Sequence, residues 1–163
     1  RLEKSNLQRR GVRSLAMNAE CPFCTSPEVH KRCIARNEYV AVFPTNIPIV
    51  PLHILIAPLR HASTLAELSS KERDALFDMA QRMATVLKKK FGARGFNFAW
   101  NEGTAGGQSV SHLHLHLVPR KTGDNGITEY EPRKFLYRPG SREKTPENEL
   151  QVVADSIRCA LEE

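Results

Sequence analysis

Three of the six histidines in the chain fall in one short segment, residues 112–117, which reads His-Leu-His-Leu-His-Leu. Successive side chains of a β-strand point to opposite faces, so a strand here places three imidazoles on one face and three leucines on the other. Near neutral pH, imidazole either binds a metal or serves as nucleophile and proton donor. A purely structural role would need three separate hydrogen-bond partners. The segment therefore predicts a chemically active strand face.

The residues before this segment contain many hydrogen-bond donors. Residues 101–109 read Asn-Glu-Gly-Thr-Ala-Gly-Gly-Gln-Ser. Glycines let backbone N–H groups approach a ligand, and amide and hydroxyl side chains add further donors. A plain hairpin turn has the same composition, but the position directly before the histidines favours a phosphate-binding loop.

A Cys-x-x-Cys motif, Cys21 to Cys24, has the spacing of half a zinc site. Redox chemistry uses the same spacing, but no thioredoxin-like βαβ pattern surrounds this motif. Tetrahedral zinc needs two more ligands, and His61 and His112 are the candidates. The alternative is two buried thiols and two ordinary histidines.

The elements that must position these residues are read from periodicity and from helix and strand breakers. The long helix begins with a capping box, Ser69 with Glu72, continues with an apolar face over 76–87 and ends at Gly92. A second helix starts around Pro146 near the C-terminus. The expected strands are 33–35, 39–43, 53–57, 96–100 and 111–118, the last stopped by proline. The pattern predicts an α+β domain with a five-stranded antiparallel sheet, one long helix and a C-terminal helix.

Length and charge limit the functional classes. The 163 residues suffice for one domain, which we expect over 19–163 after a flexible basic arm at 1–18. The net charge is +6, but residues 1–16 hold five basic residues and one acidic residue, so the body is nearly neutral and nucleic acid is a disfavoured partner. No apolar run is long enough for a membrane span. Cysteine usage favours a reducing, cytoplasmic location.

The segment from Asn101 to Val118 resembles the signature of the histidine triad (HIT) family, in which three histidines alternate with apolar residues and two further apolar residues follow. The resemblance covers residues 19 to about 125. It implies the HIT-like fold, a homodimer, and hydrolysis or transfer at the α-phosphate of AMP conjugates. The implied partner is a purine nucleotide or a dinucleoside polyphosphate.

The resemblance also implies roles for individual residues. His114, the middle histidine, would be the nucleophile that forms a nucleotidyl-histidine intermediate, and His116 would hydrogen-bond the phosphate. Asn46 stands near the position that contacts the ribose hydroxyls. His53 stands where many members have a histidine behind the triad, although a satisfied core histidine is the equal alternative. The remaining phosphate or leaving-group contacts would be Asn101, Gly107, Gln108 and Ser109.

The Cys-x-x-Cys motif resembles the zinc-bearing branch of the same family and its relatives, the galactose-1-phosphate uridylyltransferases. In these proteins the motif, a histidine after a proline-containing strand and the first triad histidine bind structural zinc. Cys21, Cys24, His61 and His112 fill the four positions here. The resemblance thus implies a structural Zn²⁺ and no organic cofactor.

The residues after the triad, 119–124, resemble the dinucleoside polyphosphate branch (Fhit-like and many bacterial members) more than the Hint branch. Diadenosine polyphosphates are therefore the favoured substrates, and Arg120 and Lys121 either meet extra phosphates or belong to a solvated loop. Two enzymatic alternatives are an AMP-phosphoramidate hydrolase and a dinucleoside polyphosphate phosphorylase. Two alternatives of other classes are a nucleotide-sensing or nucleic-acid-end-binding protein, which would use the arm and 133–142, and a redox protein.

Overall fold

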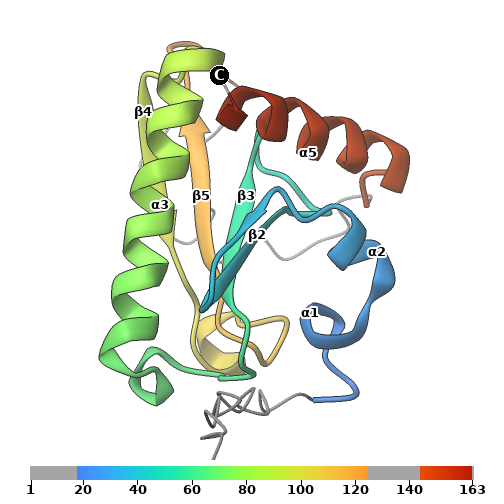
Figure 1. Ribbon diagram of the computed structural model, residues 1–163, viewed down its shortest axis with the longest axis vertical. Helices are drawn as coiled ribbons and strands as arrows, with labels where there is room; N and C mark the ends of the chain where they lie inside the picture. The colour runs from blue at the N-terminus through green and yellow to red at the C-terminus, as the bar shows by residue number, and fades with distance from the viewer. Residues whose placement is uncertain (1–17, 125–143, 163) are drawn as a thin grey trace, which may run out of the picture.

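The computed structural model describes residues 18–124 and 144–162, and Figure 1 shows their arrangement. The expected arm at 1–18, except its last residue, and the basic stretch 133–142 lie outside the described residues. The helices are α1 (Pro22–Thr25), α2 (Pro27–Lys31), α3 (Ser70–Phe91) and α5 (Glu147–Glu162), with short 3-10 turns η1 (Leu65–Glu67) and η2 (Thr104–Gly106). The strands are β1 (Ala35–Arg36), β2 (Val40–Pro44), β3 (Ile54–Pro58), β4 (Gly95–Ala99) and β5 (Leu115–Arg120).

The five strands form one sheet in the order β1-β2-β3-β5-β4, with every neighbouring pair antiparallel. The β1–β2 hairpin turns where it was expected, because the side chain of Asn37 accepts hydrogen bonds from the N–H groups of Tyr39 and Val40. β5, which carries His116, lies between β3 and the edge strand β4. The prediction of a five-stranded antiparallel α+β fold is confirmed.

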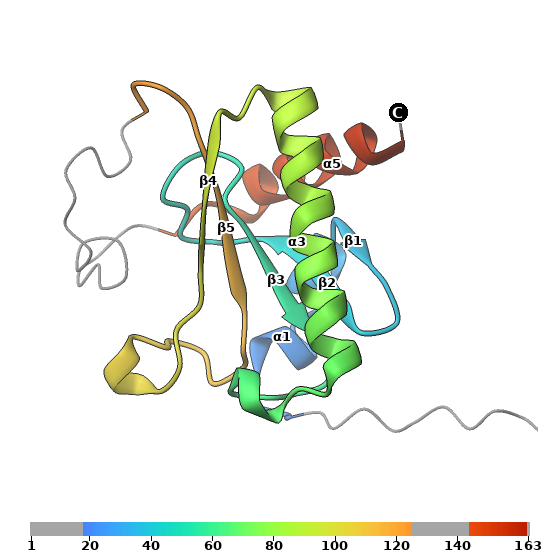
Figure 2. The ribbon, with the colours of Figure 1, turned by 90° about the vertical axis from the view of Figure 1, so that its left-hand side faces the viewer.

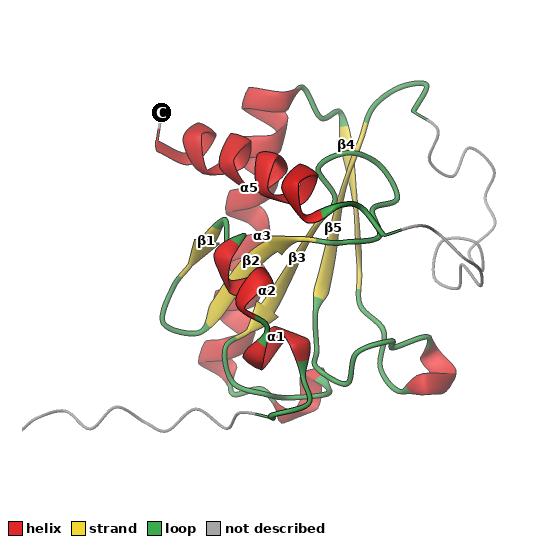
Figure 3. Cartoon of the chain, turned by 90° about the vertical axis from the view of Figure 1, so that its right-hand side faces the viewer, coloured by secondary structure: helices red, strands yellow, loops and turns green. Residues whose placement is uncertain are grey.

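The two faces of the sheet carry different layers, which Figure 1 shows side by side: α3, then the sheet, then α1 and α2. The main core lies between the sheet and α3 and includes Leu113, Leu115 and Leu117. The opposite face carries α1 and α2, seen in front of the sheet in Figure 3, over a smaller apolar cluster around Phe43 and Leu55. The leucines therefore fill the core and leave the histidines on the other face.

The long helix α3 forms as its sequence predicts. The Ser69 side chain accepts from the Glu72 N–H while the Glu72 carboxylate accepts from the Ser69 N–H. Gly92 ends the helix with φ +70°, a left-handed conformation that suits glycine. Met83 and Leu87 lie on the buried side of α3. Figure 2 shows this helix in front of β2 and β3.

The C-terminal helix α5 runs over one end of the sheet, from the side of α2 to the side of α3 (Figure 1). Leu150, Ala154 and Ile157 are buried on one face of it, and Ala154 and Ile157 belong to the main core. The Arg158 side chain donates to the Cys33 carbonyl and secures the helix beside β1.

The expected strand 111–118 is displaced in the structure, where β5 begins at Leu115 and continues through Pro119. The residues before it leave the sheet, since the Leu113 N–H donates to the Ala62 carbonyl rather than to a strand. Pro119 does not stop the strand, because the pairing of β5 with β3 ends at Leu117. Beyond that point β5 has only β4 beside it, and a proline is tolerated there.

Among the described residues, no helix combines the length and the apolar composition that a membrane span requires.

Candidate active site and metal centre

Four potential metal ligands from three separate segments meet at one end of the sheet. Cys21 is the N-cap of α1 and Cys24 lies within it, His61 follows β3, and His112 precedes β5. Their ligand atoms all lie within 4.8 Å of one another, and three of the four residues are buried. The structure thus brings together all four residues that the sequence predicts as ligands.

The distances in this cluster match tetrahedral zinc. Zn–S and Zn–N bonds of about 2.3 and 2.0 Å at a tetrahedral angle separate sulfur from nitrogen by about 3.5 Å. His112 Nδ1 lies 3.3 Å from Cys21 Sγ and 3.6 Å from Cys24 Sγ. His61 Nδ1 lies 3.6 Å from Cys24 Sγ. Two thiols and two imidazoles form a closed donor set that zinc prefers.

The tautomer and the protonation state of His112 suit metal binding. Its Nε2 lies 2.9 Å from the Pro58 carbonyl oxygen, which can only accept, so Nε2 carries the proton and Nδ1 faces the two sulfurs. Burial lowers the pKa of His112 to about 4, so the ring is neutral at neutral pH. A neutral imidazole with a free Nδ1 lone pair is the form that binds metal.

His114 is held in the tautomer that a nucleophile requires. Its Nδ1 donates to the carbonyl of His112 over 2.8 Å, so Nε2 has no proton and presents a lone pair. The side chain is buried, and burial lowers the pKa of His114 below its usual range. The imidazole is therefore uncharged at neutral pH and competent to attack an electrophile.

His53 and His116 are joined by a hydrogen bond that fixes which ring nitrogen of each carries the proton. The Ile49 N–H donates to His53 Nδ1 over 3.1 Å, so His53 carries its proton on Nε2. That Nε2 lies 3.0 Å from His116 Nδ1, which therefore accepts and leaves the His116 proton on Nε2. Leu52, with φ +67°, forms the strained turn that brings the His53 ring within reach of Ile49. Of the two roles open to His53 from the sequence, the structure favours support of the triad.

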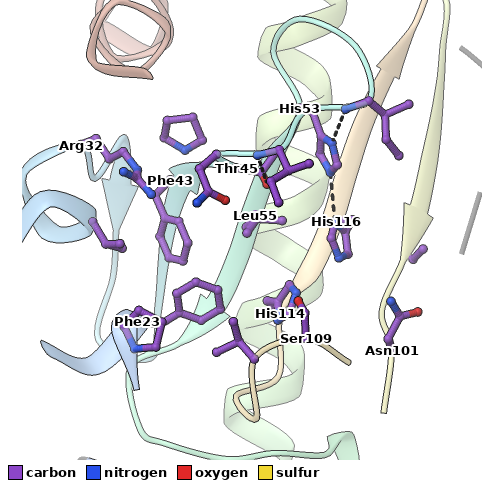
Figure 4. Close-up of a pocket in the computed structure, with 18 of the residues that line it drawn as sticks. Phe23, Arg32, Phe43, Thr45, His53, Leu55, Asn101, Ser109, His114 and His116 are labelled. Carbon is purple, nitrogen blue, oxygen red and sulfur yellow. Dashed lines mark hydrogen bonds between the residues drawn. The ribbon is translucent and has the colours of Figure 1, made fainter. Parts of the chain in front are cut away.

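A cavity of about 330 Å³ lies in front of these histidines (Figure 4). One end is lined by polar groups, which are His114, His116, Ser109 and Asn101. The walls toward the other end are the apolar side chains of Phe23, Phe43 and Leu55. A polar end that carries imidazole, hydroxyl and amide groups beside an aromatic-walled end suits a nucleotide, with its phosphate at the histidines and its base between the rings.

The glycine-rich loop forms the polar rim of the cavity. Gly107 has φ +85°, a conformation that requires glycine, and it lines the cavity with Ser109. The Asn101 amide donates to the Gly107 carbonyl over 3.4 Å. Gln108, also predicted as a contact, is not among the residues that line the cavity, and its Oε1 accepts from the Gly103 N–H while its Nε2 donates to the Ser63 carbonyl. Gln108 therefore braces the loop instead of lining the cavity.

Of the remaining predicted contacts, one lines the cavity and another lies away from it. Asn46 lines the cavity, and its backbone carbonyl accepts from the N–H of Thr145 before α5. Arg120 does not reach the cavity, because its guanidinium pairs with the Asp124 carboxylate and donates to the Asn97 amide oxygen. Asp124 also accepts from the Lys121 N–H, so the Arg120–Asp124 pair stabilises the loop that follows β5.

Several residues that line the cavity were missed by the sequence reasoning, among them Phe23, Phe43 and Arg32. Phe23 lies inside the Cys-x-x-Cys motif and Phe43 in an expected strand, so both carried a usable signal. Arg32 carried none, because its place depends on a contact with Glu147, 115 residues further along the chain.

Comparison with curated proteins shows several relatives. A bis(5'-adenosyl)-triphosphatase of Dictyostelium discoideum is 30% identical over 118 residues, which are 71% of this chain and 76% of that protein. An AP-4-A phosphorylase of Mycobacterium tuberculosis is 36% identical over 112 residues, 66% of this chain and 57% of that protein. An asymmetrical bis(5'-nucleosyl)-tetraphosphatase of Schizosaccharomyces pombe is 35% identical over 89 residues, 55% of this chain and 49% of that protein.

Solved structures share the fold. A Zn-bound histidine triad family protein from Mycobacterium smegmatis has a TM-score of 0.66 at 25% identity and covers 88% of this chain and 94% of its own. The sequence profile described as the HIT domain matches residues 26–123, which include β1 to β5 and the histidine segment. By its sequence and its fold, the chain belongs to the HIT domain family.

Proposed function

We propose that this chain is a nucleotidyl hydrolase or transferase that acts at the α-phosphate of AMP conjugates, with diadenosine polyphosphates as substrates. The names of the Dictyostelium, fission yeast and mycobacterial relatives support this substrate class. The observation that carries the proposal is His114: a buried, uncharged imidazole whose Nε2 lone pair is set by the His112 carbonyl, at the polar end of an aromatic-walled cavity.

The reaction runs in two displacements. His114 Nε2 attacks the α-phosphorus, a P–N bond forms, and the P–O bond to the leaving polyphosphate breaks. Water then attacks the same phosphorus, the P–N bond breaks, AMP is released and the neutral imidazole returns. Two steps replace one difficult displacement, and the covalent intermediate stays in the cavity between them.

The other polar groups stabilise charge as it develops. His116, protonated on Nε2, donates to a phosphate oxygen, and His53 holds it in that tautomer. Ser109 and Asn101 line the same end of the cavity and supply further donors, with Gly107 leaving room for the phosphate. We assign Asn46 to the ribose hydroxyls, because it lines the same cavity and its amide can both donate to and accept from a hydroxyl.

A phosphorylase is the second candidate. The mycobacterial relative named AP-4-A phosphorylase is 36% identical to this chain, a higher value than for the hydrolase-named Dictyostelium relative. In that reaction inorganic phosphate replaces water in the second displacement, and the product is ADP instead of AMP.

We further propose that Cys21, Cys24, His61 and His112 bind a structural Zn²⁺ ion. The donor set and its spacing support zinc, as does the Zn-bound neighbour of the same fold. The ion would tie the segment around α1 to the segment before β5 and keep the His112 carbonyl in place for His114. Both thiols must stay reduced to hold zinc, so we place the protein in the cytoplasm.

We also propose a homodimer that pairs through β4. This strand is an edge of the sheet and carries Phe98, which is 49% exposed, and Trp100 directly after the strand is 41% exposed. Trp100 and the exposed Phe77 of α3 line one hollow and form an apolar patch beside this edge. An edge strand beside such a patch is suited to a second copy of the chain.

Product analysis with diadenosine tetraphosphate tests the proposed reaction. Hydrolysis yields AMP and ATP, whereas phosphorolysis in added phosphate yields ADP and ATP. Diadenosine triphosphate and an AMP-phosphoramidate, assayed in parallel, define the leaving group. Release from the diadenosine substrates supports the proposal, and no release from any of the three under conditions where AMP binds would overturn it.

A further inference from the structure

Arg32 is a buried arginine that lines the nucleotide cavity. It follows α2, and its side chain is only 7% exposed. Figure 4 shows it at the end of the cavity away from Asn101 and His116, extending toward Phe43. Arginine is rarely so buried without a defined partner, because desolvation of a charge is costly.

Part of that cost is offset by Glu147 at the start of α5. Arg32 NH1 lies 2.7 and 2.5 Å from the two carboxylate oxygens of Glu147. The carboxylate thus neutralises the guanidinium and fixes its orientation. The pair also links α5 to the cavity, although these two residues are far apart in the sequence.

One donor of Arg32 is left over. Its Nε is buried and has no hydrogen-bond partner within the described part of the chain. A buried donor without a partner costs free energy that a ligand atom recovers when it accepts the hydrogen bond. The arrangement therefore indicates a ligand acceptor at this end of the cavity.

The charge balance shows what kind of acceptor is suited to this place. A phosphate would require a net positive site, and Glu147 has already neutralised Arg32. The walls beside Arg32 are the aromatic rings of Phe23 and Phe43, whose centroids are 5.0 Å apart. A neutral acceptor on an aromatic ring system satisfies both conditions, and purine ring nitrogens are such acceptors.

We propose that Arg32 is a specificity-determining residue that recognises the nucleobase through its Nε–H, with Glu147 as the positioning residue that holds it. This inference rests on the proposed function and adds the residue by which the site selects a base-bearing ligand over a bare sugar phosphate. It also gives the C-terminal helix a role in binding.

The test compares two ligands and two matched variants by calorimetry. The ligands are AMP and ribose 5-phosphate, which has the same sugar and phosphate but no base. Arg32→Lys keeps a cation beside Glu147 but removes the Nε donor, and Arg82→Lys changes an exposed arginine of α3. Loss of a hydrogen bond from a charged donor is expected to weaken AMP binding about tenfold in Arg32→Lys. Its ribose 5-phosphate affinity should stay within about twofold of wild type, and Arg82→Lys should change neither.

Unchanged AMP binding in Arg32→Lys would overturn the inference. So would an equal loss for both ligands, because it would place the effect on the phosphate or on the fold, and a thermal melt of the same samples distinguishes these two causes. Binding is measured without turnover, which separates this inference from the proposed function. A wild-type protein that binds AMP through Arg32 but cleaves no dinucleotide leaves the inference intact and removes the proposed reaction.

Discussion

The Nε2 atom of His53 lies 3.0 Å from Nδ1 of His116, while the His53 Nδ1 accepts from the backbone N–H of Ile49. A backbone donor thus sets the tautomer of His53, and His53 in turn sets that of His116. The proton of His116 is left on Nε2, so a backbone amide outside the triad determines what the third triad histidine offers to a phosphate.

Replacement of His53 by alanine is expected to lower kcat about 10- to 100-fold with a smaller change in KM, because His116 loses the partner that orders its proton. Steady-state kinetics on diadenosine tetraphosphate measure both parameters. His30→Ala serves as the control, since His30 is exposed and is not among the residues that line the cavity. Wild-type kcat in His53→Ala would show that His116 needs no ordering.

Replacement of His114 by alanine should abolish turnover and change the Kd for AMP by no more than a few-fold, because the nucleophile contacts the nucleotide only at phosphorus. His114→Gly offers a sharper form, in which added imidazole should restore measurable AMP release by filling the vacated space. Retained turnover without imidazole in either variant would remove His114 from the role of nucleophile.

Replacement of Cys21 by serine should lower the bound zinc well below one ion per chain and reduce Tm by more than about 5 °C, because the ion links segments distant in the sequence. Elemental analysis and thermal melts provide the readouts. Cys159→Ser is the matched control, since Cys159 is exposed on α5 and outside the cluster. Equal zinc content in the two variants would exclude Cys21 as a ligand.

Glu72 predicts a pH-dependent contribution to stability. The Arg60 guanidinium, with the Ser69 cap, lowers the pKa of Glu72 to about 2 from its ordinary 4.5. A lowered pKa stabilises the fold above the unfolded value, and this contribution is lost as pH falls from about 4.5 toward 2. Glu72→Gln should therefore cost about 1–2 kcal/mol at pH 7, after allowance for partial exposure, and progressively less below pH 4.5.

Urea unfolding of wild type and Glu72→Gln at several pH values from 7 to 2.5 measures this difference. Asp78→Asn, at an exposed position on the same helix, should show no such dependence. A gap between wild type and Glu72→Gln that stays constant with pH would contradict the assigned ion pair.

Replacement of Trp100 by glutamate should convert a dimer to a monomer, because a charge would be buried against the partner's apolar patch. Light scattering or sedimentation measures the mass. Val152→Glu is the control, since Val152 is 65% exposed on α5, away from β4. Equal masses for wild type and Trp100→Glu would argue against this patch as the interface.

Local sequence patterns were sufficient for much of the architecture. The capping box at Ser69, the stop at Gly92 and the apolar face between them depend on neighbours within a few residues, so the sequence predicts α3 correctly. The alternation in 112–117 likewise predicts that Leu113, Leu115 and Leu117 enter the core, although only residues from Leu115 onward lie in β5. The displaced start of β5 was not predictable, because it depends on the pairing of Leu113 with Ala62, 51 residues earlier.

In the site too, some features follow from local sequence and others depend on contacts between distant segments. Residue type and spacing identified the triad and all four metal-ligand candidates, because ligand chemistry restricts which residues can serve. Only the tertiary structure showed that the Gln108 amide bonds to Gly103 and Ser63 and braces the loop. It also brought Arg32 into the cavity through Glu147. Such hydrogen bonds between distant segments leave no local pattern, because each partner is an ordinary residue in its own part of the chain.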